Sequence, residues 1–417
     1  MGFSQALSGL NAAASSLDVL GNNIANSQTV GYKGASAQFA DVFAGATGLG
    51  TKVANVLQNF EDGNIEATER NLDLAISGQG FYRFEQAGEV VYSRNGQLSM
   101  TPDGYLENAQ GARIMGYGIN AAGAVQQGGQ PEVLRVPADE MPASATTDVA
   151  TTFNLDAREA AGSDLSQATV TLPDGTEDTA EYHFSNNFSV FDSLGNSRNV
   201  TVYYEKAGAN EWNARVSLDG YSNPDNDFTV TFDNNGQLDT ITDNLGNPVN
   251  APTIAVANDN TTPLGTGPAA LSFDLDLAGS TQFGNTSTTS SLTQNGYTSG
   301  ALVGISIEND GTIVRNYANE QSRPAGQIAL AFFRNPEGLT PQGDNAWAAT
   351  GESGQELLGE PGTGVLGTVQ SGAIETSNVD LAKQLVDMIV TQRAYQANSQ
   401  TIKTQDEVLQ ASINLSR

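Results

Sequence analysis

Residues 3–24 read FSQALSGLNAAASSLDVLGNNI, and this run decides how the fold is interpreted. Its apolar and small residues recur in alternating steps of four and three, which is the spacing of a heptad seam along one face of an α-helix. The seam consists of Phe3, Leu7, Leu10, Ala14, Leu17, Gly21 and Ile24. The opposite face carries serine and asparagine, and Asp18 is the only charged side chain before Lys33. Such a small, neutral face predicts close packing against neighbours, and an ordinary amphipathic helix on its own domain is the alternative.

The C-terminal end of the sequence repeats this pattern and predicts a second helix over about 378–415. Its seam includes Leu381, Leu385, Met388, Gln392, Tyr395, Ile402 and Leu409, and a second stripe of Val386, Ile389, Val390, Ala394 and Ala397 lies beside it. Asn378 or Ser377 is the expected N-cap, with Asp380 in the first turn. At 1.5 Å per residue the helix would be about 55 Å long. Because isolated helices are marginal in water, we expect both ends to be largely disordered in the monomer and to fold when subunits assemble.

The region between the two helices has the pattern of a β protein. Alternation of apolar and polar residues predicts strands at 168–172, 200–204, 228–232 and 271–277, with Asp274 and Asp276 facing water. Turn sequences such as Pro102-Asp103-Gly104 recur at strand spacing. The predicted fold class is therefore mainly β with α-helical termini, in a discontinuous multi-domain chain whose two ends pair.

Composition shifts divide the chain into predicted domains. Segments near 143–152 and 279–291 are rich in Thr, Ser, Ala and Gly, and we interpret them as joints around a module of normal domain size. A helical assembly domain is expected at 1–32 and 370–417, connecting segments at 33–70 and 350–369, an inner β domain at 71–144 and 292–349, and an outer acidic β domain at 145–291. Residues 145–290 contain 20 acidic and 4 basic side chains, so this module carries much of the negative charge.

Composition also excludes several classes of function. The formal net charge of −29 disfavours binding to nucleic acid or to an anionic membrane. The sequence has no cysteine and one histidine, His183, which excludes disulfides, thiolate zinc sites and multi-histidine metal sites. No run approaches the roughly 18 apolar residues of a membrane helix, and the N-terminus lacks the features of a cleaved signal peptide.

Three short motifs invite a chemical interpretation, and a structural one is favoured for each. Residues 362–367 match GxGxxG but follow Glu360-Pro361 rather than a strand, so we expect a turn-rich loop instead of a dinucleotide site. Residues 233–236 resemble a calcium loop with its glycine misplaced, so an Asn-Gly hairpin turn is expected. A lone histidine in a strand-like run is usually structural, as expected of His183. We therefore expect no catalytic residue, cofactor or metal, and an enzyme is the least favoured class.

Motifs at both ends resemble those of the bacterial flagellar rod and hook axial proteins. The N-terminal motif includes Ser8–Ala13, Leu17–Asn26 and Thr29–Lys33, and the C-terminal motif includes Ser377–Leu381, Gln392–Asn398 and Ile402–Thr404. Asn22, Asn23, Asn26, Gly31 and Tyr32 match the first motif, and Asn378, Leu381, Gln392, Arg393 and Tyr395 match the second. We expect Gly31 to bend the chain out of the first helix and the asparagines to satisfy backbone groups at its end. Arg393 either pairs between subunits or is solvated.

Internal motifs place the sequence nearer the hook branch of this family than the rod branch. Residues 72–81 and 92–96 are shared with distal rod proteins, whereas 190–196, 294–297 and 343–347 are hook-like. The resemblance implies a tubular polymer with the terminal helices paired in a coiled-coil-like inner wall and barrel-like or sandwich-like β domains outside. It implies a structural subunit of a curved, flexible tube, a universal joint that transmits torque from motor and rod to filament.

The same resemblance implies partners and location. The partners would be copies of the chain itself, the distal rod protein, the hook cap, the hook–filament junction protein and the flagellar export apparatus, outside the cell and without a cleaved signal. Nucleic acid and membrane insertion are not expected. Another axial subunit, such as a distal rod or hook-associated protein, is the first alternative, and a secreted β-rich adhesin is the second. The expected assembly residues are Leu7, Leu10, Leu17, Asn22, Asn23, Ile24, Asn26, Gly31, Tyr32, Asn378, Leu381, Leu385, Met388, Gln392, Arg393, Tyr395, Ile402 and Leu409.

Overall fold

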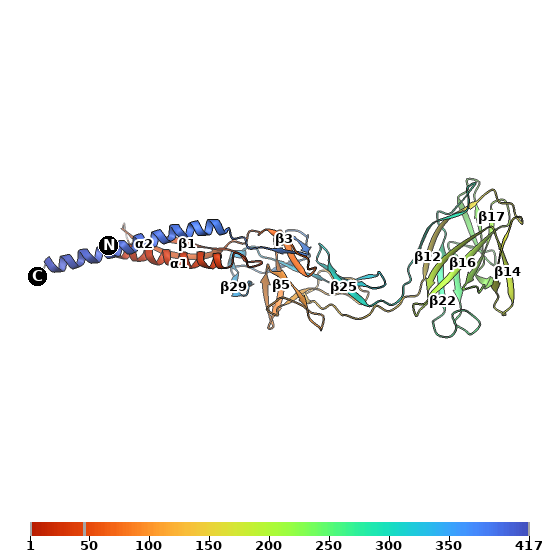
Figure 1. Cartoon of the computed structure of the whole chain (residues 1–417), viewed down its shortest axis with the longest axis horizontal. Helices are drawn as coiled ribbons and strands as arrows, with labels where there is room; N and C mark the ends of the chain where they lie inside the picture. Colours follow the sequence, from red (N-terminus) through yellow and green to blue (C-terminus); the bar gives the residue numbers. More distant parts are fainter. Residues whose placement is uncertain (1, 45–46, 416–417) are drawn as a thin grey trace. The chain divides into compact units, whose positions relative to one another are not determined.

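The computed structural model describes residues 2–44 and 47–415. Helix α1 (Gly2–Ala25) and helix α2 (Leu381–Leu415) stand at the two ends of the chain, and strands occupy most of the sequence between them (Figure 1). The predicted fold class, mainly β with helical termini, is confirmed. The chain divides into two compact units, of which the first comprises Met1–Ala138, Val303–Asn316 and Ser322–Arg417, and the second comprises Asp139–Leu302 and Tyr317–Gln321.

In the first unit, α1 and α2 lie side by side and run antiparallel (Figure 1). The predicted pairing of the terminal helices is therefore confirmed. A long antiparallel hairpin of β1 (Ala35–Ala44) and β2 (Thr47–Gln58) also contacts α1. Two register shifts, after Gln38 and after Val42, interrupt its pairing. Because β-bulges increase the local twist, these shifts suit a ribbon that wraps along a helix.

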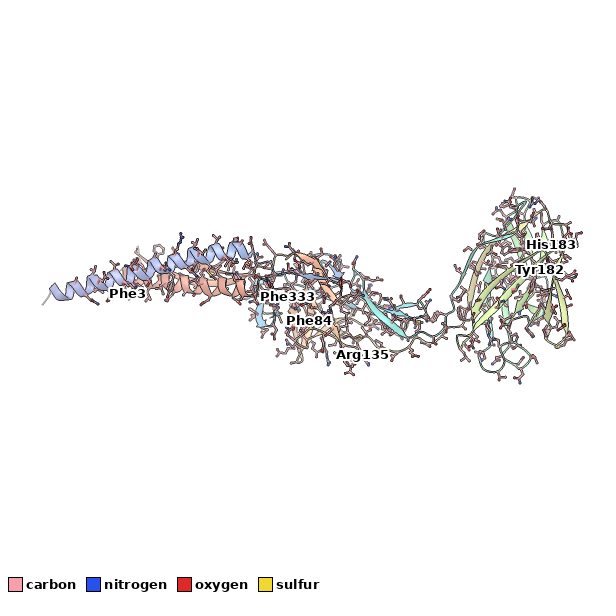
Figure 2. The ribbon with its side chains drawn as sticks, viewed as in Figure 1. Phe3, Phe84, Arg135, Tyr182, His183 and Phe333 are labelled. Atoms are coloured by element: carbon pink, nitrogen blue, oxygen red, sulfur yellow. The ribbon has the colours of Figure 1, made fainter. Side chains whose placement is uncertain are left out.

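The remainder of the first unit is a β core with one large sheet and two small ones. Its strands, lying there wholly or for most of their length, are β3 (Ile65–Ala67), β4 (Asp73–Ser77), β5 (Phe81–Gln86), β6 (Glu89–Ser93), β7 (Gly96–Gln97), β8 (Ser99–Met100), β9 (Leu106–Glu107), β10 (Arg113–Tyr117), β11 (Glu132–Val133), β25 (Leu302–Ile307), β26 (Thr312–Tyr317), β27 (Ser322–Ile328), β28 (Leu330–Phe332), β29 (Thr340–Gly343), β30 (Ala346–Ala348), β31 (Leu357–Gly359), β32 (Thr368–Ser371) and β33 (Ala373–Glu375). The main path of the large sheet runs β25-β26-β27-β10-β5-β6-β30-β29. Phe84 and Phe333 are buried in its two apolar clusters (Figure 2).

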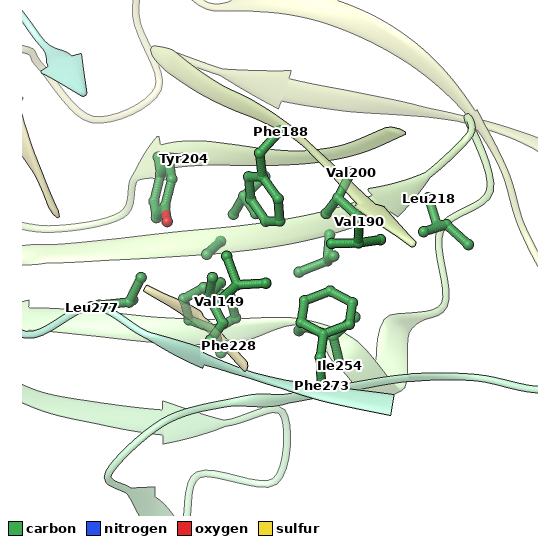
Figure 3. Close-up of a cluster of buried hydrophobic side chains, with 14 of the residues drawn as sticks. Val149, Phe188, Val190, Val200, Tyr204, Leu218, Phe228, Ile254, Phe273 and Leu277 are labelled. Atoms are coloured by element: carbon green, nitrogen blue, oxygen red, sulfur yellow. The ribbon is translucent and has the colours of Figure 1, made fainter. Parts of the chain in front are cut away.

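The second unit packs two sheets and a separate hairpin around its own core. Its strands are β12 (Asp148–Asp156), β13 (Ser166–Thr171), β14 (Glu177–Tyr182), β15 (Phe184–Phe191), β16 (Ser197–Lys206), β17 (Glu211–Leu218), β18 (Phe228–Phe232), β19 (Leu238–Asp243), β20 (Pro248–Val249), β21 (Thr253–Val256), β22 (Leu271–Asp276), β23 (Thr281–Phe283) and β24 (Thr288–Gln294). Strands β15 to β20 form an antiparallel meander, and β12 is central in a five-stranded mixed sheet. Val149, Phe273 and Tyr204 belong to the buried cluster that the two sheets share (Figure 3).

The alternating runs predicted as strands are confirmed. Residues 228–232 coincide with β18, and 200–204 lie within β16. Asp274 and Asp276 on β22 are exposed, as expected. Within the segments interpreted as joints, 148–152 belong to β12 and 288–291 belong to β24, and these two strands pair with each other. In β12 the buried residues Val149, Thr151 and Phe153 alternate with more exposed ones, so a composition rich in Thr and Ala conceals an ordinary strand pattern.

Candidate functional site

Helices α1 and α2 meet through small and polar side chains rather than through the predicted apolar seam. A Cβ atom added to Gly9 would lie 2.9 Å from Nδ2 of Asn398, and the Asn23 amide donates to Oε1 of Gln384 at 3.2 Å. Ala6, Ala13 and Leu20 are buried and lie on the same side of α1 as Gly9 by helical spacing. The two contacts fix one antiparallel register, in which Gln405 lies opposite the start of α1 and the following residues extend past it.

The predicted seam of α1 flanks this contact and is left partly uncovered. Phe3 and Leu7 are 47% and 43% exposed, and Leu10, Leu17 and Ile24 are half-buried. Phe3 is marked on α1 in Figure 2. An apolar stripe therefore follows α1 beside the line where it touches α2.

The apolar positions of α2 are exposed to a greater extent. Among the predicted assembly residues of α2, Met388 and Ile402 are half-buried, whereas Leu381, Leu385, Gln392, Arg393, Tyr395 and Leu409 are exposed. Beside them, Val386 and Val390 are 59% and 60% exposed. The half-buried positions of α2 include Gln384, Thr391 and Asn398, which are polar. Helix α2 thus turns several polar side chains toward its own chain and leaves several aliphatic ones exposed, unlike the usual amphipathic surface helix.

The β1–β2 hairpin adds a third element with exposed apolar groups. The Gln5 side chain donates to the carbonyl oxygen of Gly48 at 2.6 Å, and the Thr51 N–H donates to Oγ of Ser8 at 3.2 Å. These bonds hold the hairpin on α1. Exposed apolar side chains of the hairpin include Phe39, Phe43, Leu49, Val53 and Val56.

Asparagines end α1, as the sequence predicts. Asn23 is 1% exposed, and its side chain donates to the carbonyl oxygen of Ala35 at 2.7 Å and accepts from the Ala35 N–H at 2.9 Å. The Tyr32 hydroxyl reaches Oδ1 of Asn23 at 3.3 Å. Asn26 donates to the carbonyl oxygen and to the side-chain oxygen of Asn22 at 3.0 and 2.9 Å. The Asn26 side chain therefore satisfies a carbonyl group at the end of α1, and the Asn23 side chain fixes the segment that follows the helix.

Gly31 makes the bend that was expected of it. Its φ angle is +70°, in the left-handed region that favours glycine. A Cβ atom at this position would lie 2.6 Å from the backbone nitrogen of Asn95. The N–H of Gly31 donates to the carbonyl oxygen of Glu375 at 2.8 Å, which joins the end of α1 to the strand that precedes α2.

Asn378 is placed differently from the prediction. The N-cap of α2 is Asp380, whose Oδ1 accepts from the Lys383 N–H at 3.1 Å, so the assignment to Asn378 or Ser377 is wrong. Asn378 instead accepts from the Gly34 N–H at 2.8 Å and donates to the carbonyl oxygens of Asn59 and Glu61 at 2.8 and 3.0 Å. Its amide is already used by two distant segments, so it does not cap the helix.

A charged cluster lies where the segments next to α1 and α2 meet the β core. We call its members, Lys33, Asp62, Arg94 and Glu375, the neck charges. Lys33 Nζ is 2.7 Å from Oε1 of Glu375, and Arg94 Nε is 2.7 Å from Oε2 of the same carboxylate. A second nitrogen of Arg94 reaches Asp62 Oδ1 at 2.7 Å. The side chains of Lys33, Arg94 and Glu375 are 1%, 3% and 0% exposed, whereas that of Asp62 is 52% exposed.

The surroundings of these charges shift their pKa values. Burial alone would raise the pKa of Glu375, but Arg94, Lys33 and the Gly63 N–H outweigh it, so the pKa lies below its usual value. Burial lowers the pKa of Lys33, and the adjacent Glu375 opposes that shift. Ionised Glu375 is therefore the centre on which both cations depend.

Sequence reasoning singled out none of the neck charges as functional residues. Lys33 and Arg94 lie inside the motifs Thr29–Lys33 and Tyr92–Gly96, in which glycine, asparagine and tyrosine are the more distinctive residues. The available signal was that Lys33 is the first basic residue of a chain with only 18 Lys and Arg. Glu375 gave no signal, because it is one of 47 acidic residues.

The three motifs of ambiguous chemistry have structural roles. Residues 362–367 form a loop closed by the Gly362 N–H on the carbonyl oxygen of Gly367, and Asp233 Oδ1 closes the β18–β19 turn by accepting from Asn235 and Gln237. His183, marked in Figure 2, accepts from the Lys206 N–H at 3.1 Å and lies 3.0 Å from the carbonyl oxygen of Ser163. Within the described residues, no group of acidic or histidine side chains is arranged to hold a metal ion. Neither helix has the length and hydropathy together that a membrane crossing needs, as far as the described residues extend.

Comparison with known proteins covers nearly the whole chain. Residues 4–33 match the family described as flagella basal body rod protein, and 370–415 match the flagellar basal body rod FlgEFG protein C-terminal family. Residues 75–154 match the flagellar hook protein FlgE/F/G D1 domain, and 154–297 match the flagellar basal body protein FlaE D2 domain.

Relatives and a solved structure agree with these matches. The flagellar hook protein FlgE of Escherichia coli K12 is 44% identical over 100% of both chains, and that of Borreliella burgdorferi is 34% identical over 98% of both. The crystal structure of Helicobacter pylori flagellar hook protein FlgE2 covers 75% of this chain and 100% of its own, with a TM-score of 0.52 at 13% identity, and supports the fold. The chain belongs to the flagellar hook protein family.

Proposed function

We propose that this chain is the structural subunit of a bacterial flagellar hook and that it polymerises with copies of itself through α1, α2 and the β1–β2 hairpin. The observation that carries the proposal is the outward aliphatic surface of α2, including Leu385, Val386, Ile389 and Val390. Burial of one such side chain contributes ~1.5–3 kcal/mol, so leaving several of them in water is unfavourable. A contiguous apolar surface of this kind marks an interface.

The distribution of charge supports a copy of the same chain as the occupant of that surface. Residues 1–45 carry one basic and two acidic side chains, and residues 377–417 carry four of each, so the terminal elements of two copies approach without net repulsion. Residues 145–290 carry 20 acidic and 4 basic side chains. We infer that this acidic module keeps the polymer soluble while the neutral ends pack. Repeated heterologous contacts of one chain generate a helical polymer when the rotation does not close.

The finer parts of the function follow from the same proposal. The polymer acts as a flexible joint that transmits torque, with the helices in its inner wall and 145–291 as its outer domain. Its further partners are the distal rod protein, the hook cap, the hook–filament junction protein and the export apparatus that delivers the chain outside the cell without a cleaved signal. The role is mechanical rather than enzymatic, and neither nucleic acid nor a membrane is a partner.

The experiment replaces one residue of each stripe, Leu10→Asp with Leu385→Asp, and compares polymer formation by electron microscopy. We expect the wild type to form curved tubes and the double variant to remain monomeric. The control is Leu245→Asp, because Leu245 is 80% exposed and belongs to the second unit, whereas both helices belong to the first. Fluorescence of Trp212, buried in the second unit, checks that this unit stays folded in a Trp347→Phe background. Normal tubes from the double variant would refute the proposal, and straight rods from the wild type would indicate a rod subunit.

A further inference from the structure

We propose that Lys33, Arg94 and Glu375 are positioning residues for assembly: they fix the terminal helices and the hairpin on the β core so that the apolar stripes face neighbouring subunits in one orientation. This inference rests on the proposed function, because it assigns residues that do not lie on the assembly surface to the act of polymerisation.

The connections of the chain place every assembly element at the neck charges. Lys33 stands between the end of α1 and the start of β1, and Asp62 follows the end of β2. Glu375 is the last residue of β33, shortly before α2 begins. Arg94 follows β6 and belongs to the β core. The helices and the hairpin are thus each connected to the core through a residue of one cluster.

The hydrogen bonds of Glu375 give this cluster a single geometry. Oε1 accepts from Lys33 Nζ and from the Gly63 N–H at 2.7 and 2.8 Å, and Oε2 accepts from Arg94. The backbone carbonyl of Glu375 accepts from Gly31, as described above. One residue therefore holds the segment after α1, the segment after the hairpin and the core at the same time.

Arg94 anchors the cluster to the core. Its guanidinium donates to the carbonyl oxygens of Gly78 and Gly80 at 2.8 and 2.7 Å, in addition to Glu375 and Asp62. Lys33 Nζ donates to the carbonyl oxygen of Glu61 at 2.6 Å as well as to Glu375. Two cations and two carboxylates balance in charge, so no net charge is left in the neck.

Stability alone does not account for such a cluster. A buried ion pair is generally no more stabilising than well-packed apolar side chains of the same volume, but it tolerates only one arrangement of donors and acceptors. The first unit also has an apolar core, built from residues such as Tyr82, Phe84 and Ile114. We therefore attribute to the neck charges mainly the orientation of the segments that leave this core.

The test compares Lys33→Met, Glu375→Gln and the double variant in the full-length chain. The double variant removes one charge of each sign and leaves Arg94 with Asp62, so its charge remains balanced. Asp192→Asn is the control, because Asp192 is a buried carboxylate that pairs with the half-buried Arg198 in the second unit. Polymerisation is measured as the lowest protein concentration that yields tubes, and hydrogen exchange reports on the backbone.

We expect all three neck variants, the double variant included, to need at least about tenfold more protein to form tubes. Exchange should accelerate at Gly31, Gly63 and Ala35, while β5 and β10 keep wild-type protection and the control polymerises normally. Wild-type assembly by the double variant would overturn the inference, and so would an equal loss of protection in β5 and β10. A wild type that never polymerises would instead refute the proposed function.

Discussion

Gly34 donates its backbone N–H to Oδ1 of Asn378 at 2.8 Å, although 344 positions separate the two residues. A Cβ atom at Gly34 would lie 3.1 Å from Val379 and 3.4 Å from this Asn378 oxygen, so the two segments touch directly. The start of the hairpin and the approach to α2 are therefore held in contact by one side-chain amide. The segment before α2 is thus held by residues that follow α1.

Replacing Asn378 with alanine should loosen this contact. The substitution removes one accepted and two donated hydrogen bonds, and it leaves the Gly34 N–H without its partner, which costs about 1–3 kcal/mol. We expect the first unit to unfold at lower denaturant concentration, as reported by Trp347 fluorescence in a Trp212→Phe background, and exchange at Gly34 to accelerate. Asn11→Ala is the control, because Asn11 is an exposed asparagine of α1. Equal midpoints for Asn378→Ala and wild type would contradict the expectation.

Two glycines near the N-terminus should respond in opposite ways to alanine. At Gly31 the Cβ atom would meet the backbone of Arg94 and Asn95 within 3 Å at a positive φ, so Gly31→Ala should destabilise the first unit by more than about 1 kcal/mol. At Gly21, inside α1, an added Cβ atom would meet no described atom within 4 Å beyond the helix's own backbone, so Gly21→Ala should raise the helicity of the N-terminal segment, worth about 0.5–1 kcal/mol. Circular dichroism measures the helicity of both variants, and denaturant titration measures their free energy of unfolding. A tolerated Gly31→Ala would mean that the bend is not required.

The close approach of α1 to α2 at Gly9 gives a third prediction. Gly9→Val should push against the Asn398 amide and separate the helices, at a cost of about 1–3 kcal/mol typical of overpacking. We expect fewer tubes at a fixed protein concentration. Adding Asn398→Ala should restore assembly in part, because it removes the atoms that the new side chain meets. If the second substitution gives no recovery, the helix contact is not the cause of the defect.

Asp227 gives the second unit a defined pH dependence. Burial raises its pKa to about 6, against hydrogen bonding from Val216 and the charge of Arg215. Because the folded chain binds this proton more tightly than the unfolded chain, the site stabilises the fold below about pH 4, and the contribution disappears as pH rises through 6. Asp227→Asn should therefore stabilise the second unit at pH 7, by up to about 3 kcal/mol.

The measurement is the denaturant midpoint for unfolding of the second unit, followed by Trp212 fluorescence at several pH values between 4 and 7 in the Trp347→Phe background. The wild type should lose stability at this site as pH rises, and the variant should not. Asp239→Asn, at an exposed position of β19, serves as control and should titrate like the wild type. A variant whose pH profile matches the wild type would show that Asp227 is not the group responsible.

The sequence predicts the helices and many strands because these depend on local periodicity. Seven-residue spacing around Leu7 and Leu385 places both helices, and alternation in 228–232 places β18. Periodicity does not reveal which face of a helix meets its own chain. The face of α1 that meets α2 carries Gly9, Ala13 and Asn23, one residue offset from the apolar seam, because small side chains allow the closer approach of two backbones.

The neck charges and the role of Asn378 could not be predicted because they depend on contacts between distant segments. Lys33 meets Glu375 only after the β core has brought both ends of the chain together, and no local pattern in either segment records this. Asn378 is a residue type that favours N-caps, but Asp380 caps α2, and the Asn378 amide is bonded to two segments from the other end of the sequence. Tertiary contacts decided both outcomes over local preference.

Because 342 positions separate Lys33 from Glu375, the neck charges can form only in a chain that extends at least as far as Glu375. A chain that ends before Glu375 contains Lys33 and Arg94 but lacks the carboxylate that both of them contact, and burying these cations without it is costly. Its N-terminal helix would have no fixed direction and no α2 beside it. Only a molecule that contains Glu375 and the part of α2 opposite α1 can present both helices in register, so we expect chains truncated before that point to be excluded from the proposed polymer.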